Sequence, residues 1–117
     1  MSAKGTTRIA PIEVTDATFA QEVLQSPAPV LLDCWAPWCG PCRTVAPVLE
    51  RIACSRAGRV IVLKLNIDDF PQEASRRRVQ GVPAFLIFRC GVEDARQVGL
   101  LPEGAMARWV DGFALAA

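Results

Sequence analysis

Three short apolar runs constrain the fold most: Val30–Trp35, Val60–Asn66 and Ala84–Arg89. A short apolar run bounded by breakers is typical of a strand that is buried on both faces. The segments between these runs have helical spacing instead, so strands and helices alternate along the chain. The sequence therefore predicts an α/β fold, with a central mixed β-sheet flanked by α-helices.

Four segments carry the caps and breakers of helices. Thr15 or Asp16 would cap the first, which ends near residue 25. The second would begin at residues 39–41 and end near residue 56. Asp68 or Asp69 would cap the third, with a proline in its first turn, and the last would begin near Pro102.

Two further strands complete the predicted sheet. The first is Ile12–Thr15, and the last follows a hairpin turn at Cys90-Gly91 and ends near Gly99. The 117 residues suffice for one domain, 1–117, in which residues 1–8 are expected to be a flexible N-terminus.

The composition argues against several classes of protein. A net charge of +1 gives no reason to expect binding to nucleic acid or to a membrane. No run approaches the roughly 18 apolar residues of a membrane span, and the polar N-terminus lacks a signal peptide's apolar region. We therefore expect a cytoplasmic protein, where thiols stay reduced. The absence of histidine removes the usual general base and the commonest metal ligand.

The segment Trp38-Cys39-Gly40-Pro41-Cys42 joins a buried strand to a helix start. Two cysteines three residues apart in a first helical turn lie within disulfide reach. The unpaired N–H groups and positive dipole end favour a thiolate on Cys39, which we expect to be the more exposed of the two. A shielded Cys42 would then resolve the mixed disulfide.

The other interpretation of this pair is half of a zinc site. Zinc usually needs a second pair or histidines, and Cys34, Cys54 and Cys90 are isolated in the sequence. We therefore expect neither a metal nor a cofactor.

Asp33 interrupts an otherwise apolar strand. Two interpretations are open: an outward-facing or capping position, or a buried carboxyl that accepts the Cys42 proton through a water. In the second interpretation Lys64, in the next strand, would modulate it. Gly81-Val82-Pro83-Ala84 also allows two interpretations, a simple break between helix and strand or a cis proline that opens the strand.

Four segments together resemble the thioredoxin family, over about residues 12–114. They are the active-site strand and loop, a third-strand motif, a cis-proline loop and a late glycine: Val30–Cys42, Lys64–Asp68, Gly81–Ala84 and Val98-Gly99. The resemblance implies that Cys39 is the nucleophile, Cys42 the resolving thiol and Asp33 the proton acceptor, with Lys64 near it and Pro83 in the cis form. It also implies an apolar substrate-binding surface, with the Val82 backbone pairing with a client segment: Trp38, Gly40, Pro41, Ile67, Val82, Pro83, Gly99 and Leu100.

Five residues depart from the family pattern, and two of the changes, Arg43 for a usual lysine and Ala84 for a usual threonine, should be mild. Cys34 replaces a usual phenylalanine and should pack as a small apolar residue. Pro102 replaces a serine cap, and Cys90 stands in a turn where a positive φ would strain it. Apart from these departures, Cys54 falls off its helix's apolar stripe, so it should be partly exposed.

The expected function is that of a general cytoplasmic protein-disulfide reductase. The resemblance implies that it is a monomer whose partners are disulfide-containing client proteins and an NADPH-dependent thioredoxin reductase. Three alternatives stay open: a dedicated reductant or oxidant of few clients, a structural zinc protein, and a binding or chaperone subunit whose cysteine pair is incidental.

Overall fold

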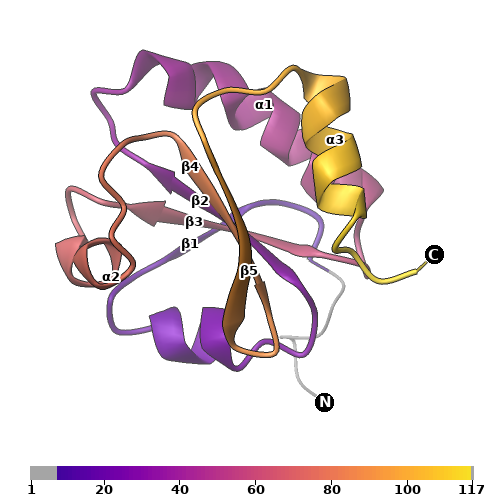
Figure 1. The fold of residues 1–117 in the computed structure, drawn as a ribbon, viewed down its shortest axis with the longest axis horizontal. Helices are drawn as coiled ribbons and strands as arrows, with labels where there is room; N and C mark the ends of the chain where they lie inside the picture. The colour runs from indigo at the N-terminus through magenta and orange to yellow at the C-terminus, as the bar shows by residue number, and fades with distance from the viewer. Residues whose placement is uncertain (1–7, 117) are drawn as a thin grey trace.

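A computed structural model describes residues 8–116 as a five-stranded mixed sheet between two layers of helices (Figure 1). The strand order is β1-β3-β2-β4-β5, and the bounds are β1 Ile12–Val14, β2 Val30–Trp35, β3 Ile61–Asn66, β4 Ala84–Arg89 and β5 Val92–Val98. β1, β3 and β2 are parallel, whereas β4 and β5 are antiparallel to their neighbours. The predicted α/β class and mixed sheet are confirmed.

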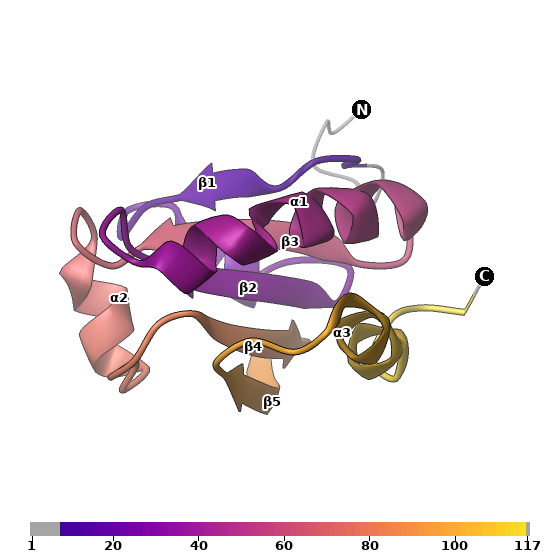
Figure 2. The ribbon, with the colours of Figure 1, turned by 90° about the horizontal axis from the view of Figure 1, so that it is seen from above.

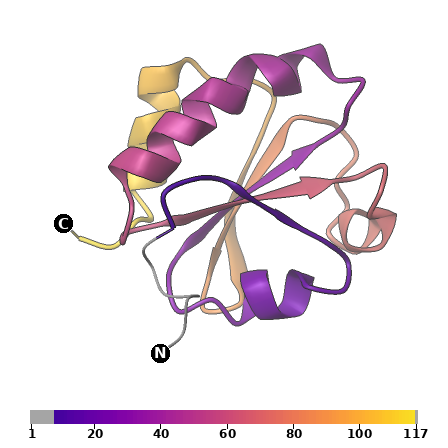
Figure 3. The same ribbon diagram turned by 180° about the vertical axis from the view of Figure 1, so that it is seen from behind.

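The helices cover the two faces of the sheet unequally. α1 (Gly40–Ser55) and α3 (Glu103–Asp111) lie on one face, and α1 crosses over β3 in Figure 2. The other face carries α2 (Pro71–Arg76) and η1 (Ala20–Leu24), which Figure 3 shows from behind. Each face has its own apolar cluster, because side chains alternate between the faces along a strand.

The first predicted helix is wrong in extent. Only Ala20–Leu24 is helical, as a single wide turn in which the Gln25 N–H donates to the Ala20 carbonyl at 3.0 Å. The preceding residues form a turn closed by two reciprocal bonds, from the Thr15 N–H to Thr18 Oγ1 at 2.9 Å and from the Thr18 N–H to Thr15 Oγ1 at 3.1 Å. The threonine hydroxyls thus satisfy backbone groups that a longer helix would have used.

The predicted caps of two helices are also wrong. Asp16 does not cap its own helix; its carboxylate accepts from the N–H groups of Gln72 and Glu73, at 3.3 and 2.9 Å, at the start of α2. Neither Asp68 nor Asp69 caps α2, because Asp68 Oδ1 accepts from Trp38 Nε1 and Asp69 Oδ2 accepts from Asn66 Nδ2 instead. The helix start is therefore capped from a distant part of the chain, which no local spacing could indicate.

Three further predictions concern the hairpin turn, the start of the last helix and the N-terminus. Cys90 and Gly91 form the hairpin turn with φ of +52° and +79°, so the expected positive φ at Cys90 is confirmed. Pro102 precedes α3 and provides no side-chain cap. Of the N-terminus expected to be flexible, residues 1–7 lie outside the described residues, and Arg8 pairs with Glu22 at 2.8 Å.

Candidate functional site

The strand ends explain why four distant segments meet. Parallel β2 and β3 finish at the same end of the sheet, where the Ile67 N–H donates to the Trp35 carbonyl at 3.0 Å. Antiparallel β4 starts at that end of the sheet, with Ala84 opposite Cys34, and β5 finishes there, with Val98 opposite Ala84. The sheet topology thus brings the loops after β2, β3 and β5 together with the loop before β4.

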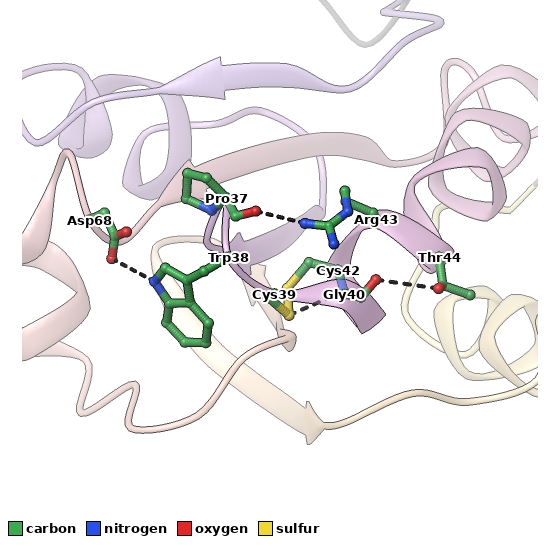
Figure 4. Close-up of a disulfide and its surroundings, with 8 residues drawn as sticks. All are labelled: Pro37, Trp38, Cys39, Gly40, Cys42, Arg43, Thr44 and Asp68. Carbon is green, nitrogen blue, oxygen red and sulfur yellow. Dashed lines mark hydrogen bonds between the residues drawn. A yellow bond between two sulfur atoms is a disulfide. The ribbon is translucent and has the colours of Figure 1, made fainter.

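A disulfide between Cys39 and Cys42 lies at this end of the sheet, with the two Cα atoms 5.3 Å apart (Figure 4). Cys39 is the N-cap of α1 and has extended backbone angles, and its Sγ accepts a hydrogen bond from the Cys42 N–H at 3.1 Å. Pro41 stands in the first turn, where its missing N–H is not needed. The predicted pair and its helix start are confirmed.

The helix terminus favours negative charge on the first sulfur. The N–H groups of a first helical turn have no partners within the helix, and one of them already points at Cys39 Sγ. A thiolate there is stabilised, which makes it both a good nucleophile and a good leaving group. The expected difference in exposure is wrong for the disulfide form, since Cys39 and Cys42 are each 4% exposed.

Three side chains hold the loop that carries the pair (Figure 4). Arg43 Nη1 donates to the Pro37 carbonyl at 2.7 Å, and Trp38 Nε1 donates to Asp68 Oδ1 at 3.3 Å. The Trp38 side chain nevertheless stays 66% exposed beside the disulfide. The sequence placed Trp38 at the site but gave no sign of its bond to Asp68, because that bond joins residues of different loops.

The cis-proline loop packs behind the cysteines. The Val82–Pro83 bond is cis, as expected, and Val82 and Ile67 pack against the cluster formed by the two cysteines and Ala36. The Gly99 N–H donates to the Pro83 carbonyl at 2.8 Å, with Gly99 at φ +88°. Leu100, the next residue, is 45% exposed. Trp35 also packs on this cluster and was missed among the expected site residues.

Asp33 is buried, so its interpretation as an outward-facing or capping residue is wrong. It is 1% exposed, and Oδ1 accepts no hydrogen bond from any residue in the range 8–116. Burial raises its pKa to about 7, against a lowering by Lys64 and a further raising by Glu13. Asp33 lies two residues after Leu31 in β2, and both therefore point to the sheet face covered by α1. Lys64 is its register partner in β3.

Glu13 is a charged residue of this region that the sequence did not single out. It pairs in register with Lys64, so Glu13, Lys64 and Asp33 form one row across β1, β3 and β2. Burial raises the pKa of Glu13, while Lys64 lowers it. Its position between Ile12 and Val14 in a strand was the available signal, but its partner depends on the register.

The remaining cysteines lie elsewhere. Cys34 is buried and packs in the cluster on the α2 face, as expected, whereas Cys54 and Cys90 are exposed and unpaired. Within residues 8–116, no three His, Cys, Asp or Glu side chains gather so as to hold a metal ion. None of the helices described there is long and apolar enough to cross a membrane.

Known proteins provide an independent comparison. The family model described as Thioredoxin matches residues 10–112. "Thioredoxin 1" of Nostoc sp. is 46% identical over 99 residues, which cover 85% of this chain and 92% of that protein. "Thioredoxin 1" of Synechococcus elongatus is 48% identical over 98 residues (84% and 92%), and "Thioredoxin" of Mycobacterium tuberculosis is 48% identical over 99 residues (85% of each).

Proposed function

Since this chain belongs to the thioredoxin family and is a thiol–disulfide oxidoreductase, we propose that it is a general protein-disulfide reductase. The observation that carries the proposal is the Cys39–Cys42 disulfide at the start of α1, with Cys39 Sγ accepting the Cys42 N–H. A pair that forms a disulfide at this position can return to a dithiol and pass two electrons to another disulfide.

In the proposed cycle the dithiol form begins the reaction. The Cys39 thiolate attacks a client disulfide, an Sγ–S bond forms, and the client's other sulfur leaves as a thiolate that takes up a proton. Cys42 then loses its proton to Asp33 and attacks Cys39 Sγ, which releases the second client sulfur as a thiolate. This thiolate takes up a proton from solvent, and Asp33 returns the Cys42 proton to solvent. The chain ends as the disulfide, and the client has gained two electrons and two protons.

Asp33 suits the role of proton acceptor because of its burial. A carboxyl with its ordinary pKa would be fully ionised at neutral pH and a weak base, whereas a pKa of about 7 lets it both take and release a proton. Lys64, opposite it in β3, favours the ionised form and would keep the pKa from rising further.

The client would bind to the apolar surface around the disulfide. The proposed contacts combine exposed side chains with the cis-proline loop, whose backbone would pair with an extended client segment: Trp38, Gly40, Pro41, Ile67, Val82, Pro83, Gly99 and Leu100. Such a surface recognises little beyond an apolar, extended segment, which suits a reductase with many clients.

We propose that NADPH supplies the electrons through a thioredoxin reductase, and that the protein acts in the cytoplasm as a monomer. Two exposed cysteines outside the site, Cys54 and Cys90, support a reducing compartment, since exposed thiols persist there. Binding to nucleic acid or to a membrane has no part in the proposal.

The first experiment is the reduction potential of the Cys39–Cys42 couple, followed by Trp38 fluorescence in a glutathione or dithiothreitol titration. A Cys54→Ser, Cys90→Ser background keeps the titration free of other disulfides. We expect one two-electron transition below about −260 mV, the lower end of the cytosolic glutathione poise measured by extraction. We also expect turnover with NADPH and thioredoxin reductase that Cys39→Ser abolishes.

Other results would contradict the proposal. A strongly oxidising potential would indicate a disulfide donor, and the absence of a two-electron transition would exclude a redox role for the pair. A Cys39→Ser, Cys42→Ser variant that still performs the biological role would point to the alternative of a binding or chaperone subunit.

A further inference from the structure

The row of three ionisable residues runs from the interior of the sheet to its edge. Asp33 is 1% exposed in central β2, the Lys64 side chain 24% in β3, and the Glu13 side chain 51% in edge strand β1. Register partners point to the same face of a sheet, and this is the face on which α1 packs. The row therefore links the buried carboxyl to the surface away from the disulfide.

Lys64 lies between two carboxyl groups and is held on the side of Glu13. Its Nζ is 3.8 Å from Glu13 Oε2 and 4.8 Å from the centre of the Trp35 ring. Asp33 Oδ1, on the other side, accepts no hydrogen bond from Lys64 or from any other residue in the described range. The ammonium group thus pairs with Glu13 rather than with Asp33, although Asp33 is also its register partner.

A recess opens to this row from the sheet edge. It has a volume of about 430 Å³, and its lining includes Glu13 and Lys64 from the sheet, Glu50 and Leu49 from α1, and Pro11. Water in such a recess reaches Lys64 and Glu13 but meets apolar packing beyond them, where Leu49 is fully buried. Glu13 can therefore act on Asp33 in two ways, directly through its own charge and by controlling where the Lys64 charge lies.

We propose that Glu13 is a positioning residue for the disulfide-reductase reaction: it holds the Lys64 ammonium at the sheet edge and so limits how strongly that charge acts on Asp33. The inference rests on the proposed function in that it gives Asp33 its proton-accepting role. With Glu13 in place, Asp33 keeps the neutral form through which it exchanges protons near pH 7. Without it, Lys64 turns toward Asp33 and fixes the carboxylate as an ion.

Other charged groups near the row are accounted for. Cys39 and Cys42 at the start of α1 are the reaction partners, and Glu50 of α1 lines the recess. Asp69 acts on Glu13 by raising its pKa, and the facing residue of β4, Phe85, carries no charge. Cys34 points to the opposite face and stays a neutral thiol there.

The test is the titration of Asp33 itself, read from its carboxyl ¹³C resonance in aspartate-labelled protein and assigned by its loss in Asp33→Asn. In Glu13→Gln we expect the midpoint to fall by about half a pH unit, the size expected for one partly exposed neighbouring charge. The acid limb of client reduction should move by the same amount, so the rate at a pH below the midpoint rises about threefold. Glu50→Gln, a matched loss of charge in the same recess, should leave the midpoint unchanged.

A double-mutant comparison separates positioning from a direct effect of the charge. In a Lys64→Gln background, Glu13→Gln should shift the Asp33 midpoint much less than in the natural chain. An unchanged midpoint in Glu13→Gln, or the same shift with and without Lys64, would overturn the proposal. The titration is readable in a protein that reduces no client, so failure of the proposed function would be recognised separately.

Discussion

Asp33 and Cys34 are neighbours in β2, are each 1% exposed, and yet belong to two chemically different faces of the sheet. Burial raises the pKa of both, to about 7 for the carboxyl and to about 12 for the thiol. Asp33 faces α1 and has Lys64 beside it, whereas Cys34 packs in the apolar cluster with α2 and η1. The comparison teaches that burial brings the pKa of a carboxyl toward neutrality but moves the pKa of a thiol away from it. The outcome depends on the ordinary pKa of the group and on the charges beside it.

The largest effect should come from removing the Asp33 carboxyl, which lies on the sheet face covered by α1. With a pKa of 3.8 unfolded and about 7 folded, Asp33 binds a proton more tightly in the folded state. Its contribution to stability is therefore complete below pH 4 and is lost as pH rises through 7, by up to about 4 kcal/mol.

Asp33→Asn should remove this loss. Urea unfolding at pH 5 and pH 8 should show a variant that is more stable than the natural chain at pH 8, by much more than at pH 5. The acid limb of client reduction should disappear with the carboxyl. Equal pH slopes in the two proteins would mean that Asp33 is not the group that titrates.

The second prediction concerns Cys34, on the sheet face covered by α2 and η1. Cys34→Ser places a hydroxyl without a partner in an apolar cluster and should lower the free energy of unfolding by about 1–3 kcal/mol at every pH. Cys34→Ala is the matched control, because it removes the sulfur without adding a polar group. A change in the pH profile of client reduction would contradict the separation of the two faces.

The smallest effect should come from the distant cap of α2. Asp16→Ala removes the acceptor of the Gln72 and Glu73 N–H groups and should lower the free energy of unfolding by about 1 kcal/mol. Asp16→Asn keeps one acceptor oxygen and should recover part of that loss. Client reduction should stay unchanged in both variants, since α2 starts on the face that carries Cys34.

The strands and the cysteine pair were predictable because their signals are local. The runs at residues 30–35 and 84–89 match β2 and β4, and the position of Cys39 at a helix start follows from the breakers around it. The predicted caps at Asp16 and Asp68 failed for the converse reason. Both carboxylates could cap a helix locally, but each accepts its hydrogen bond from a distant residue, Asp16 from the Glu73 N–H and Asp68 from Trp38 Nε1.

The row of charges illustrates the same limit at the site. Asp33 and Lys64 could be named from the sequence, because each interrupts an apolar strand. Glu13 could not, because its relation to Lys64 arises only when β1 pairs with β3 in one register. A shift of one residue would turn Glu13 to the other face of the sheet.

The hairpin turn between β4 and β5 provides a fixed attachment point for a spectroscopic label. A side chain at Gly91 would meet the Leu24 carbonyl oxygen at 2.9 Å, so the turn lies directly against the end of η1. Cys90 next to it is exposed, and β4 separates it from Pro83 and the disulfide by its full length. Once Cys54 is replaced by serine and the Cys39–Cys42 pair is kept as the disulfide, a label on Cys90 would follow the folding of the sheet without touching the residues that exchange electrons.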